Sequence, residues 1–195
     1  MIPSRQILKD NLKANFDILR MSEIDNIADL SGILKSKTKI DAFAEATGLS
    51  SEYLTLLRRE ANSYFPSPVK LSRFIGVDEI LVSRLEGHGI KTSKQLFELV
   101  ANRDQYAVFL RTSGFTQREL SELISLSDLS RLYGVGPAFA GMLFEAGLDS
   151  VQTLMRFSGE QIRKMYEEKT QRTADFTARD IDFTLEIAKE LESSM

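Results

Sequence analysis

Cysteine and tryptophan are absent from this 195-residue sequence, and histidine occurs once, at His88. Without cysteine, the chain cannot form thiolate zinc sites, redox dithiols or cysteine nucleophiles, and a single histidine excludes any multi-histidine metal site. A catalytic triad would need a nucleophile and an orienting acid around that histidine, and the sequence contains no such set. We therefore expect a protein that is not an enzyme and has no metal or other cofactor, with His88 capping a helix at the surface.

The sequence also lacks a strong net charge and long apolar runs. The 25 Lys and Arg residues and 28 Asp and Glu residues give a formal net charge of -3, so no global field attracts nucleic acid. The longest uncharged apolar-rich run, residues 132–144, contains Pro137 and three glycines and is too short to span a bilayer. No apolar stretch of signal-peptide length opens the sequence. We expect a cytoplasmic protein with no membrane partner.

Apolar residues recur at helical spacing nearly everywhere, and no alternating β-branched run indicates a sheet. The predicted fold class is therefore all-α. A single first helix is predicted by one shared apolar face, made of Leu8, Leu12, Phe16 and Leu19. Residues 175–191 predict a last amphipathic helix, whose shared face contains Phe176, Phe183, Ile187 and Leu191.

An internal repeat organises most of the chain. Residues 70–99 and 128–157 align without a gap at an offset of 58, and a weaker similarity continues upstream at an offset of 66. The first copy has extra residues around Pro66 and Pro68, a segment that excludes helix and predicts a linker. We predict four parts: an N-terminal helical extension (1–38), a first repeat (39–101), a second repeat (102–158) and C-terminal helices (159–195).

The second copy contains a hairpin sequence, Leu132-Tyr-Gly-Val-Gly-Pro137. Gly134 and Gly136 are expected to allow a tight hairpin with positive φ, and Pro137 suits the first position of the following helix. Gly147 is expected to end that helix in a left-handed conformation, and Ser150 to cap the next one.

This sequence resembles a helix-hairpin-helix motif, and the larger pattern resembles a bacterial family of unknown function built from tandem helix-hairpin-helix-like units. The resemblance covers about two thirds of the chain and implies an all-α fold of SAM-like, polymerase-type repeats with helical extensions at both ends. It implies no established activity. In DNA-binding members of the wider superfamily, backbone N–H groups of the hairpin bind the sugar-phosphate backbone.

Two functions remain open from the sequence. In the first, the second hairpin binds DNA or RNA backbone non-specifically through Arg131, Gly134, Gly136 and Ala138. In the second, the chain is a protein-interaction or scaffold module that has lost phosphate binding. Ala138 stands where a basic residue would help, which favours the second function. In the first copy, Asp78 and Glu79 follow the hairpin glycine, so that hairpin is expected to be structural, with its carboxylates at the start of a helix.

Arginine stands three residues before the hairpin glycine in both copies, as Arg73 and Arg131. Each is expected either to contact phosphate or to tie its hairpin to a neighbouring carboxylate or helix end. The pairing within the protein is the favoured interpretation, because the arginine is also present in the copy whose hairpin is acidic. A positive face is expected, if anywhere, among scattered cations after the second hairpin: Arg156, Arg163, Lys164, Lys169 and Arg172.

Overall fold

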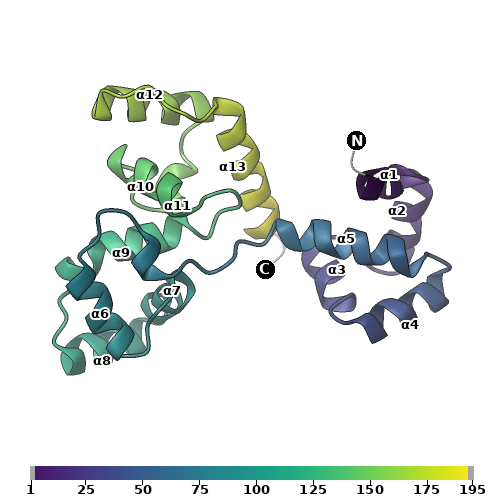
Figure 1. Cartoon of the computed structure of the whole chain (residues 1–195), viewed down its shortest axis with the longest axis horizontal. Coiled ribbons are helices and arrows are strands. Elements are labelled where there is room, and N and C mark those ends of the chain that lie inside the picture. The colour runs from purple at the N-terminus through teal and green to yellow at the C-terminus, as the bar shows by residue number, and fades with distance from the viewer. Residues whose placement is uncertain (1–2, 193–195) are drawn as a thin grey trace. The chain divides into compact units, whose positions relative to one another are not determined.

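The computed structural model describes residues 3–192 of the chain, and its side chains over residues 6–189. Within residues 3–192 every regular element is a helix: there are thirteen α-helices and one short 3-10 helix, and no β-strand (Figure 1). The predicted all-α class is confirmed. None of the described helices is both long and apolar enough to cross a membrane. The chain divides into two compact units between Phe65 and Pro66, within the segment that predicted a linker.

The N-terminal unit comprises the chain up to Phe65 together with its end from Lys189. Its helices are α1 (Pro3–Lys9), α2 (Leu12–Met21), α3 (Ile27–Ile33), α4 (Lys37–Thr47) and α5 (Ser51–Ser63). Buried apolar side chains from α2, α3, α4 and α5 form its core, including Leu19, Leu30, Ile40 and Leu54.

The prediction of a single first helix is wrong, because the structure has two. Helix α1 ends at Lys9, and Asn11 takes a left-handed conformation with φ of 53° before α2 begins at Leu12. Asparagine adopts this conformation more readily than most residues, because its short polar side chain forms local hydrogen bonds. The apolar spacing continues across the break, so periodicity alone does not reveal it.

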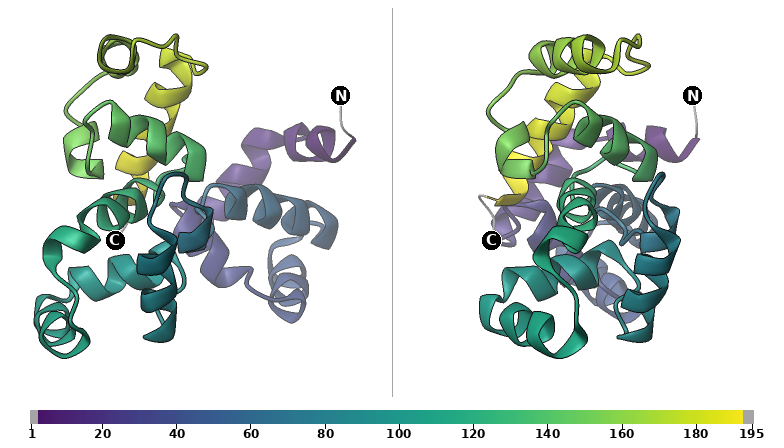
Figure 2. Two further views of the ribbon diagram at one scale, coloured as in Figure 1. Left: turned by 60° about the vertical axis from the view of Figure 1, so that its left-hand side comes forward. Right: turned by 90° about the vertical axis from the view of Figure 1, so that its left-hand side faces the viewer.

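The C-terminal unit spans Pro66–Ala188 and begins with a 3-10 helix, η1 (Leu71–Arg73). Its α-helices are α6 (Glu79–Gly87), α7 (Ser93–Ala101), α8 (Arg103–Ser113), α9 (Gln117–Leu129), α10 (Pro137–Glu145), α11 (Val151–Leu154), α12 (Gly159–Thr170) and α13 (Ala178–Glu192), the last continuing beyond the unit. Helix α9 buries Leu120, Leu123, Leu126 and Leu129 and packs against both α7 and α10. It separates α6–α8 on one side from α10–α12 on the other (Figures 1 and 2).

The backbone repeats where the sequence repeats. The alignment matches three pairs of glycines, and both members of each pair take a left-handed conformation. The φ values are 76° and 72° for Gly48 and Gly114, 83° and 77° for Gly76 and Gly134, and 83° and 87° for Gly89 and Gly147. Thr92 and Ser150, also matched, both cap the helix that follows them. The helices of the series α4 to α7 are therefore separated by the same left-handed glycines and helix caps as those of the series α8 to α11. The first series is divided between the two units, and the second lies within one.

The prediction for the last helix names the wrong buried face. Helix α13 begins at Ala178, so Phe176 precedes it, and Phe183 is 46% exposed. Ile187 is half-buried, and the side chain of Leu191 lies outside the described residues. The buried face of α13 instead consists of Ile181, Thr184, Leu185 and Ala188. Sequence periodicity favoured the large aromatic residues, whereas the helix packs through smaller side chains against its neighbours.

Candidate binding site at the second hairpin

The second hairpin connects α9 to α10 through residues 130–136. A turn forms where the N–H of Val135 donates to the carbonyl of Leu132 at 3.1 Å, and Gly134 has φ of 77°, as predicted. The prediction of a positive φ at Gly136 is wrong, because this residue has φ of -82° and ψ of 179°. The ring of a proline pushes the preceding residue into extended conformations, and Gly136 precedes Pro137. Pro137 occupies the first turn of α10, as predicted.

Helix ends beyond the hairpin also follow the predicted chemistry. Gly147 follows α10 in a left-handed conformation, and the hydroxyl of Ser150 accepts the N–H of Thr153 at 3.2 Å at the start of α11. In the first hairpin, Asp78 accepts the N–H groups of Ile80 and Leu81 at 2.8 and 3.3 Å. The prediction that the carboxylate of Asp78 lies at the start of a helix is confirmed.

Arg131 is engaged within the protein. Its Nε lies 2.9 Å from Oδ1 of Asp128, and its guanidinium carbon lies 4.0 Å from the centre of the Phe97 ring. The favoured prediction, pairing to a neighbouring carboxylate, is confirmed for this arginine. It is wrong for Arg73, whose side chain is exposed and has no ion pair or hydrogen bond within the described residues. The alignment places Lys70 where the second copy has Asp128, so the first copy lacks the matching carboxylate.

A hollow of about 500 Å³ lies directly beside the second hairpin, and we call it the hairpin hollow. Gly134 and Ala138 line it from the hairpin and the first turn of α10. Both are exposed, whereas Gly136 is half-buried and does not line it. Four aromatic side chains supply much of the wall: Tyr133, Phe139, Phe176 and Phe183.

Helix α13 closes one side of this hollow. The hydroxyl of Thr184 donates to the carbonyl of Tyr133 at 3.0 Å, and the Phe183 ring meets the Tyr133 ring edge-on with centres 5.8 Å apart. The Phe176 ring lies 5.0 Å from that of Phe139. Sequence reasoning missed these residues at the site, because a repeat search does not indicate where a helix outside the repeat packs.

The hairpin hollow is acidic. Asp175 and Asp180 line it, and no lysine or arginine does among the residues whose side chains the structure describes. The hydroxyl and N–H of Thr177 donate to Oδ2 of Asp180 at 2.6 and 3.2 Å and hold the pKa of this carboxyl below its ordinary value. Asp180 therefore carries a negative charge at neutral pH.

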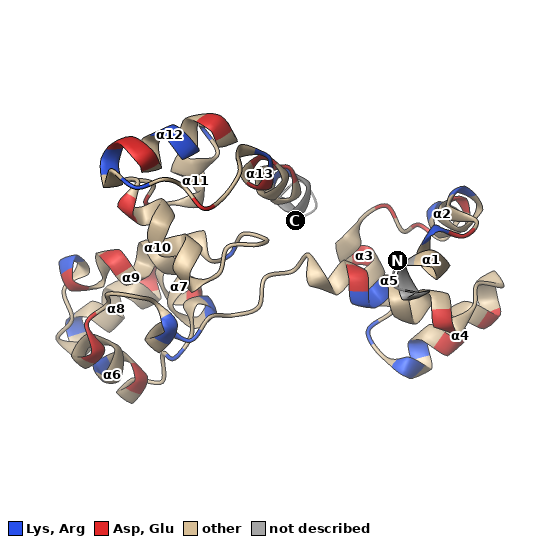
Figure 3. Cartoon of the chain, turned by 45° about the horizontal axis from the view of Figure 1, so that its top comes forward, with Lys and Arg blue, Asp and Glu red and all other residues tan. Residues whose placement is uncertain are grey.

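The cations expected to form a positive face are interleaved with carboxylates (Figure 3). Arg163 pairs with Glu160 at 2.9 Å and with Glu167 at 3.2 Å on α12. Arg172 pairs with Glu145 at 3.4 Å. These pairs cancel much of the positive field that Arg163 and Arg172 would otherwise supply.

Outside this site, His88 is exposed at the end of α6, as predicted, and its ring meets those of Phe109 and Phe115 edge-on at 5.7 Å. No group of three or more His, Asp or Glu side chains that could hold a metal ion occurs in the part of the chain that the structure describes.

A family model described as a domain of unknown function, DUF4332, matches residues 76–190. The matched segment exceeds half of the chain, begins within the first hairpin and includes the whole of the second. The chain belongs to the DUF4332 family. No curated protein and no solved structure matches the chain. The DUF4332 match begins at Gly76, the left-handed glycine of the first hairpin, and extends through most of α13, so the hairpin hollow lies entirely within it.

Proposed function

We propose that residues 39–158 consist of two tandem helix-hairpin-helix-like units and that the chain acts as a non-catalytic, cytoplasmic protein-interaction module. Its hairpin hollow binds a segment of a partner protein that carries a lysine or arginine next to an apolar side chain. The observation that carries this proposal is the pair of carboxylates, Asp175 and Asp180, at the hollow beside Gly134 and Ala138. The repeated left-handed glycines and helix caps support the tandem architecture.

The charges around the hairpin hollow favour a protein partner over nucleic acid. A phosphate approaching Gly134 or Ala138 would meet negative charge from Asp175 and Asp180, and the nearby Arg131 is paired with Asp128. Like charges at short range disfavour binding, whereas a cationic side chain in the same place is attracted. The aromatic rings add a surface on which a cation or an apolar side chain gains contact energy.

Nucleic-acid backbone binding through Arg131, Gly134, Gly136 and Ala138 is the second candidate. It is favoured by the start of α10, where Gly136 offers no side chain to cap the helix and Ala138 is exposed. The N–H groups in the first turn of a helix have no partner within the helix and can bind an anion. This candidate needs those N–H groups to outweigh the two carboxylates.

Fluorescence anisotropy of labelled single-stranded and duplex DNA and RNA, at about 50 and about 200 mM salt, separates the two candidates. We expect no binding at either salt concentration. Binding that weakens steeply with salt and is lost in the Gly136→Asp, Ala138→Asp variant would overturn our first proposal in favour of nucleic acid.

The protein-binding proposal is tested with short peptides in which one arginine is followed by leucine or phenylalanine. We expect them to shift the backbone resonances of Gly134, Ala138 and Thr184 in the isotope-labelled full chain. Asp175→Asn should weaken peptide binding roughly tenfold, the effect of losing about 1.4 kcal/mol of attraction. Glu122→Gln makes the same change in charge on an exposed residue of α9 outside the hollow and should leave binding unchanged. Equal affinity of both variants, or shifts confined to other surfaces, contradicts the proposal.

A further inference from the structure

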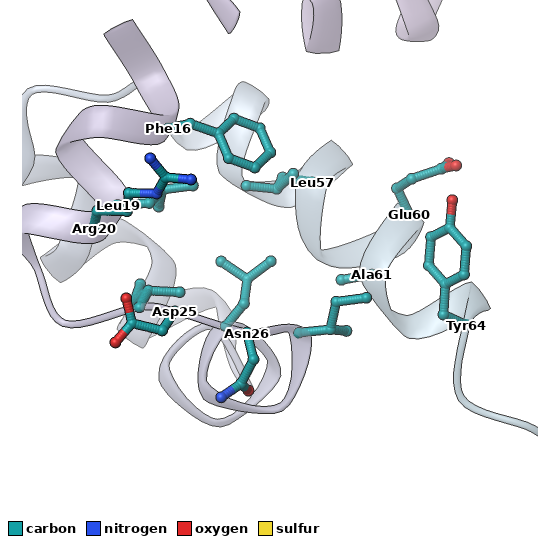
Figure 4. Close-up of a pocket in the computed structure, with 12 residues that line it drawn as sticks. Phe16, Leu19, Arg20, Asp25, Asn26, Leu57, Glu60, Ala61 and Tyr64 are labelled. Atoms are coloured by element: carbon teal, nitrogen blue, oxygen red, sulfur yellow. The ribbon is translucent and has the colours of Figure 1, made fainter. Parts of the chain in front are cut away.

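The N-terminal unit contains a separate apolar hollow of about 430 Å³, which we call the N-terminal hollow (Figure 4). It is lined by side chains from α2, α3, α5 and the loop between α2 and α3. Leu19, Leu30 and Ala61 contribute buried surface to it, and Phe16 and Leu57 stand at its upper wall in Figure 4. It lies outside the matched DUF4332 segment and does not depend on the function proposed above.

Helix α2 leaves apolar side chains uncovered beside this hollow. Leu12, Phe16 and Leu19 are spaced by four and three residues, so they share one helix face. Their exposure falls along that stripe from 50% at Leu12 to 44% at Phe16 and 4% at Leu19. The stripe thus runs from solvent into the core. An apolar helix face that continues into an apolar hollow is typical of a surface that another helix covers.

The rim of the N-terminal hollow carries charges of both signs. Arg20 lies on the α2 side, and Glu60 lies on the opposite side, on α5, with Asp25 in the loop between α2 and α3. Lys13 is exposed on α2, one residue after Leu12 in the apolar stripe. Helix α2 therefore combines uncovered apolar residues with two exposed cations, Lys13 and Arg20, and one exposed acid, Asp17, while α5 places the acid Glu60 on the rim.

We propose that the occupant of the N-terminal hollow is helix α2 of a second copy of this chain. Each copy supplies both halves of such a contact, because Leu12 can enter the partner's hollow while Phe16, in the wall of its own hollow, packs against the helix that enters there. Contacts of this kind are self-complementary and close into a two-fold dimer. The cation Lys13 on the entering helix then approaches the acidic rim at Glu60, so the charges of the two surfaces are complementary.

Sedimentation analysis of the full chain from about 1 µM to about 1 mM tests this proposal over the range in which weak and moderate interfaces dissociate. We expect a monomer–dimer equilibrium. Phe16→Asp should raise the dimer dissociation constant at least roughly tenfold, because it places a charge in the apolar contact. Met21→Asp introduces the same charge on α2 at a residue that is 86% exposed, roughly half a turn from the stripe, and should leave dimerisation unchanged. Far-UV circular dichroism checks that both variants remain folded.

Charge reversal provides a second, gentler test. Glu60→Lys should weaken the dimer, because it sets a cation opposite Lys13, whereas Glu45→Lys reverses an exposed charge on α4 away from the hollow and should have no effect. A monomer at every concentration overturns the proposal and leaves the hollow to another kind of partner. Equal effects of Phe16→Asp and Met21→Asp, or of the two charge reversals, also overturn it, because the dimer would then form through another surface.

Discussion

Arg131 and Asp128 form an ion pair in which Nε of the guanidinium lies 2.9 Å from Oδ1 of the carboxylate. The second carboxylate oxygen of Asp128 accepts the N–H of Val151 at 2.9 Å. One carboxylate therefore fastens the hairpin arginine to the end of α9 and also satisfies a free N–H group in the first turn of α11. The pairing that the sequence favoured for Arg131 therefore links the hairpin, the end of α9 and the start of α11 within the second repeat.

Asp128→Ala should destabilise the C-terminal unit more than Arg131→Ala does. Loss of Asp128 leaves the Val151 N–H and the Arg131 guanidinium without their acceptor, at a cost of about 1–3 kcal/mol. Loss of Arg131, whose side chain is 36% exposed, removes a partly screened ion pair worth about 0–1 kcal/mol. Urea unfolding of the full chain measures both changes, and amide exchange of Val151 reports the local effect. Equal costs would mean that the contact to Val151 contributes little.

The two hairpin glycines should respond differently to alanine. Gly134 has φ of 77°, and a Cβ there would lie 3.6 Å from the Thr184 hydroxyl, so Gly134→Ala should cost about 1–2 kcal/mol through backbone strain. Gly136 has φ of -82° with no atom within 4 Å of a Cβ, so Gly136→Ala should change stability by less than about 0.5 kcal/mol. Thermal unfolding measures both variants. The prediction fails if Gly136→Ala is the more damaging substitution.

Local chemistry explains which features of the fold could be predicted. Gly48, Gly147 and Ser150 end or begin helices through contacts with residues a few positions away, so their own sequence neighbourhood determines them. The negative φ of Gly136 could also have been predicted from its sequence neighbourhood, because the restriction that Pro137 places on the preceding residue is local. The break at Asn11 is harder to predict, since no glycine or proline marks it.

The candidate site could be predicted only in part, because it depends on distant contacts. The hairpin hollow exists because Thr184 and Phe183 contact Tyr133 across about 50 residues of sequence, and no spacing rule indicates this pairing. The ion pairs of Arg163 can be predicted from the sequence, since Glu160 and Glu167 stand three and four residues away, within reach on one helix.

A third prediction concerns close packing between α12 and α13. A Cβ at Gly159 would clash with the backbone of Ala178, and the Gly159 N–H donates to Oδ1 of Asp182 at 2.7 Å. Backbone cannot move aside as a side chain can, so Gly159→Ala should destabilise the C-terminal unit by about 1–3 kcal/mol. Gly141 is the matched control: it lies inside α10 with no atom within 4 Å of a Cβ. Gly141→Ala should stabilise the protein by about 0.5–1 kcal/mol, as measured by thermal unfolding.

Two results would contradict the predicted difference between Gly159→Ala and Gly141→Ala. If both alanine variants unfold at the wild-type temperature, α12 and α13 are not held as closely at Gly159 as the structure has them. If both are destabilised, the loss at Gly141 would point to a need for glycine inside α10 that its open surroundings do not explain.

The start of α13 should be sensitive to acid through Asp180. Its pKa is lowered from the ordinary value of 3.8, first by the Thr177 hydroxyl and then by the Thr177 N–H. A carboxyl with a lowered pKa in the folded state stabilises the fold above its unfolded pKa, and this contribution is lost as the pH falls through the folded pKa. Thr177→Val removes the hydroxyl and should raise the pKa of Asp180 towards 3.8, as measured by NMR titration of the carboxyl carbon.

The equivalent pair on α9 is an internal control. Hydrogen bonds from the Thr116 hydroxyl and N–H lower the pKa of Glu119 in the same way. Thr177→Val should leave Glu119 unchanged, and Thr116→Val should raise the pKa of Glu119 without moving that of Asp180. A shift of both carboxyls in either variant would indicate a general loosening of the C-terminal unit. With Asp180 still ionised between about pH 4 and pH 7, binding of a cationic peptide at the hairpin hollow should persist across that range.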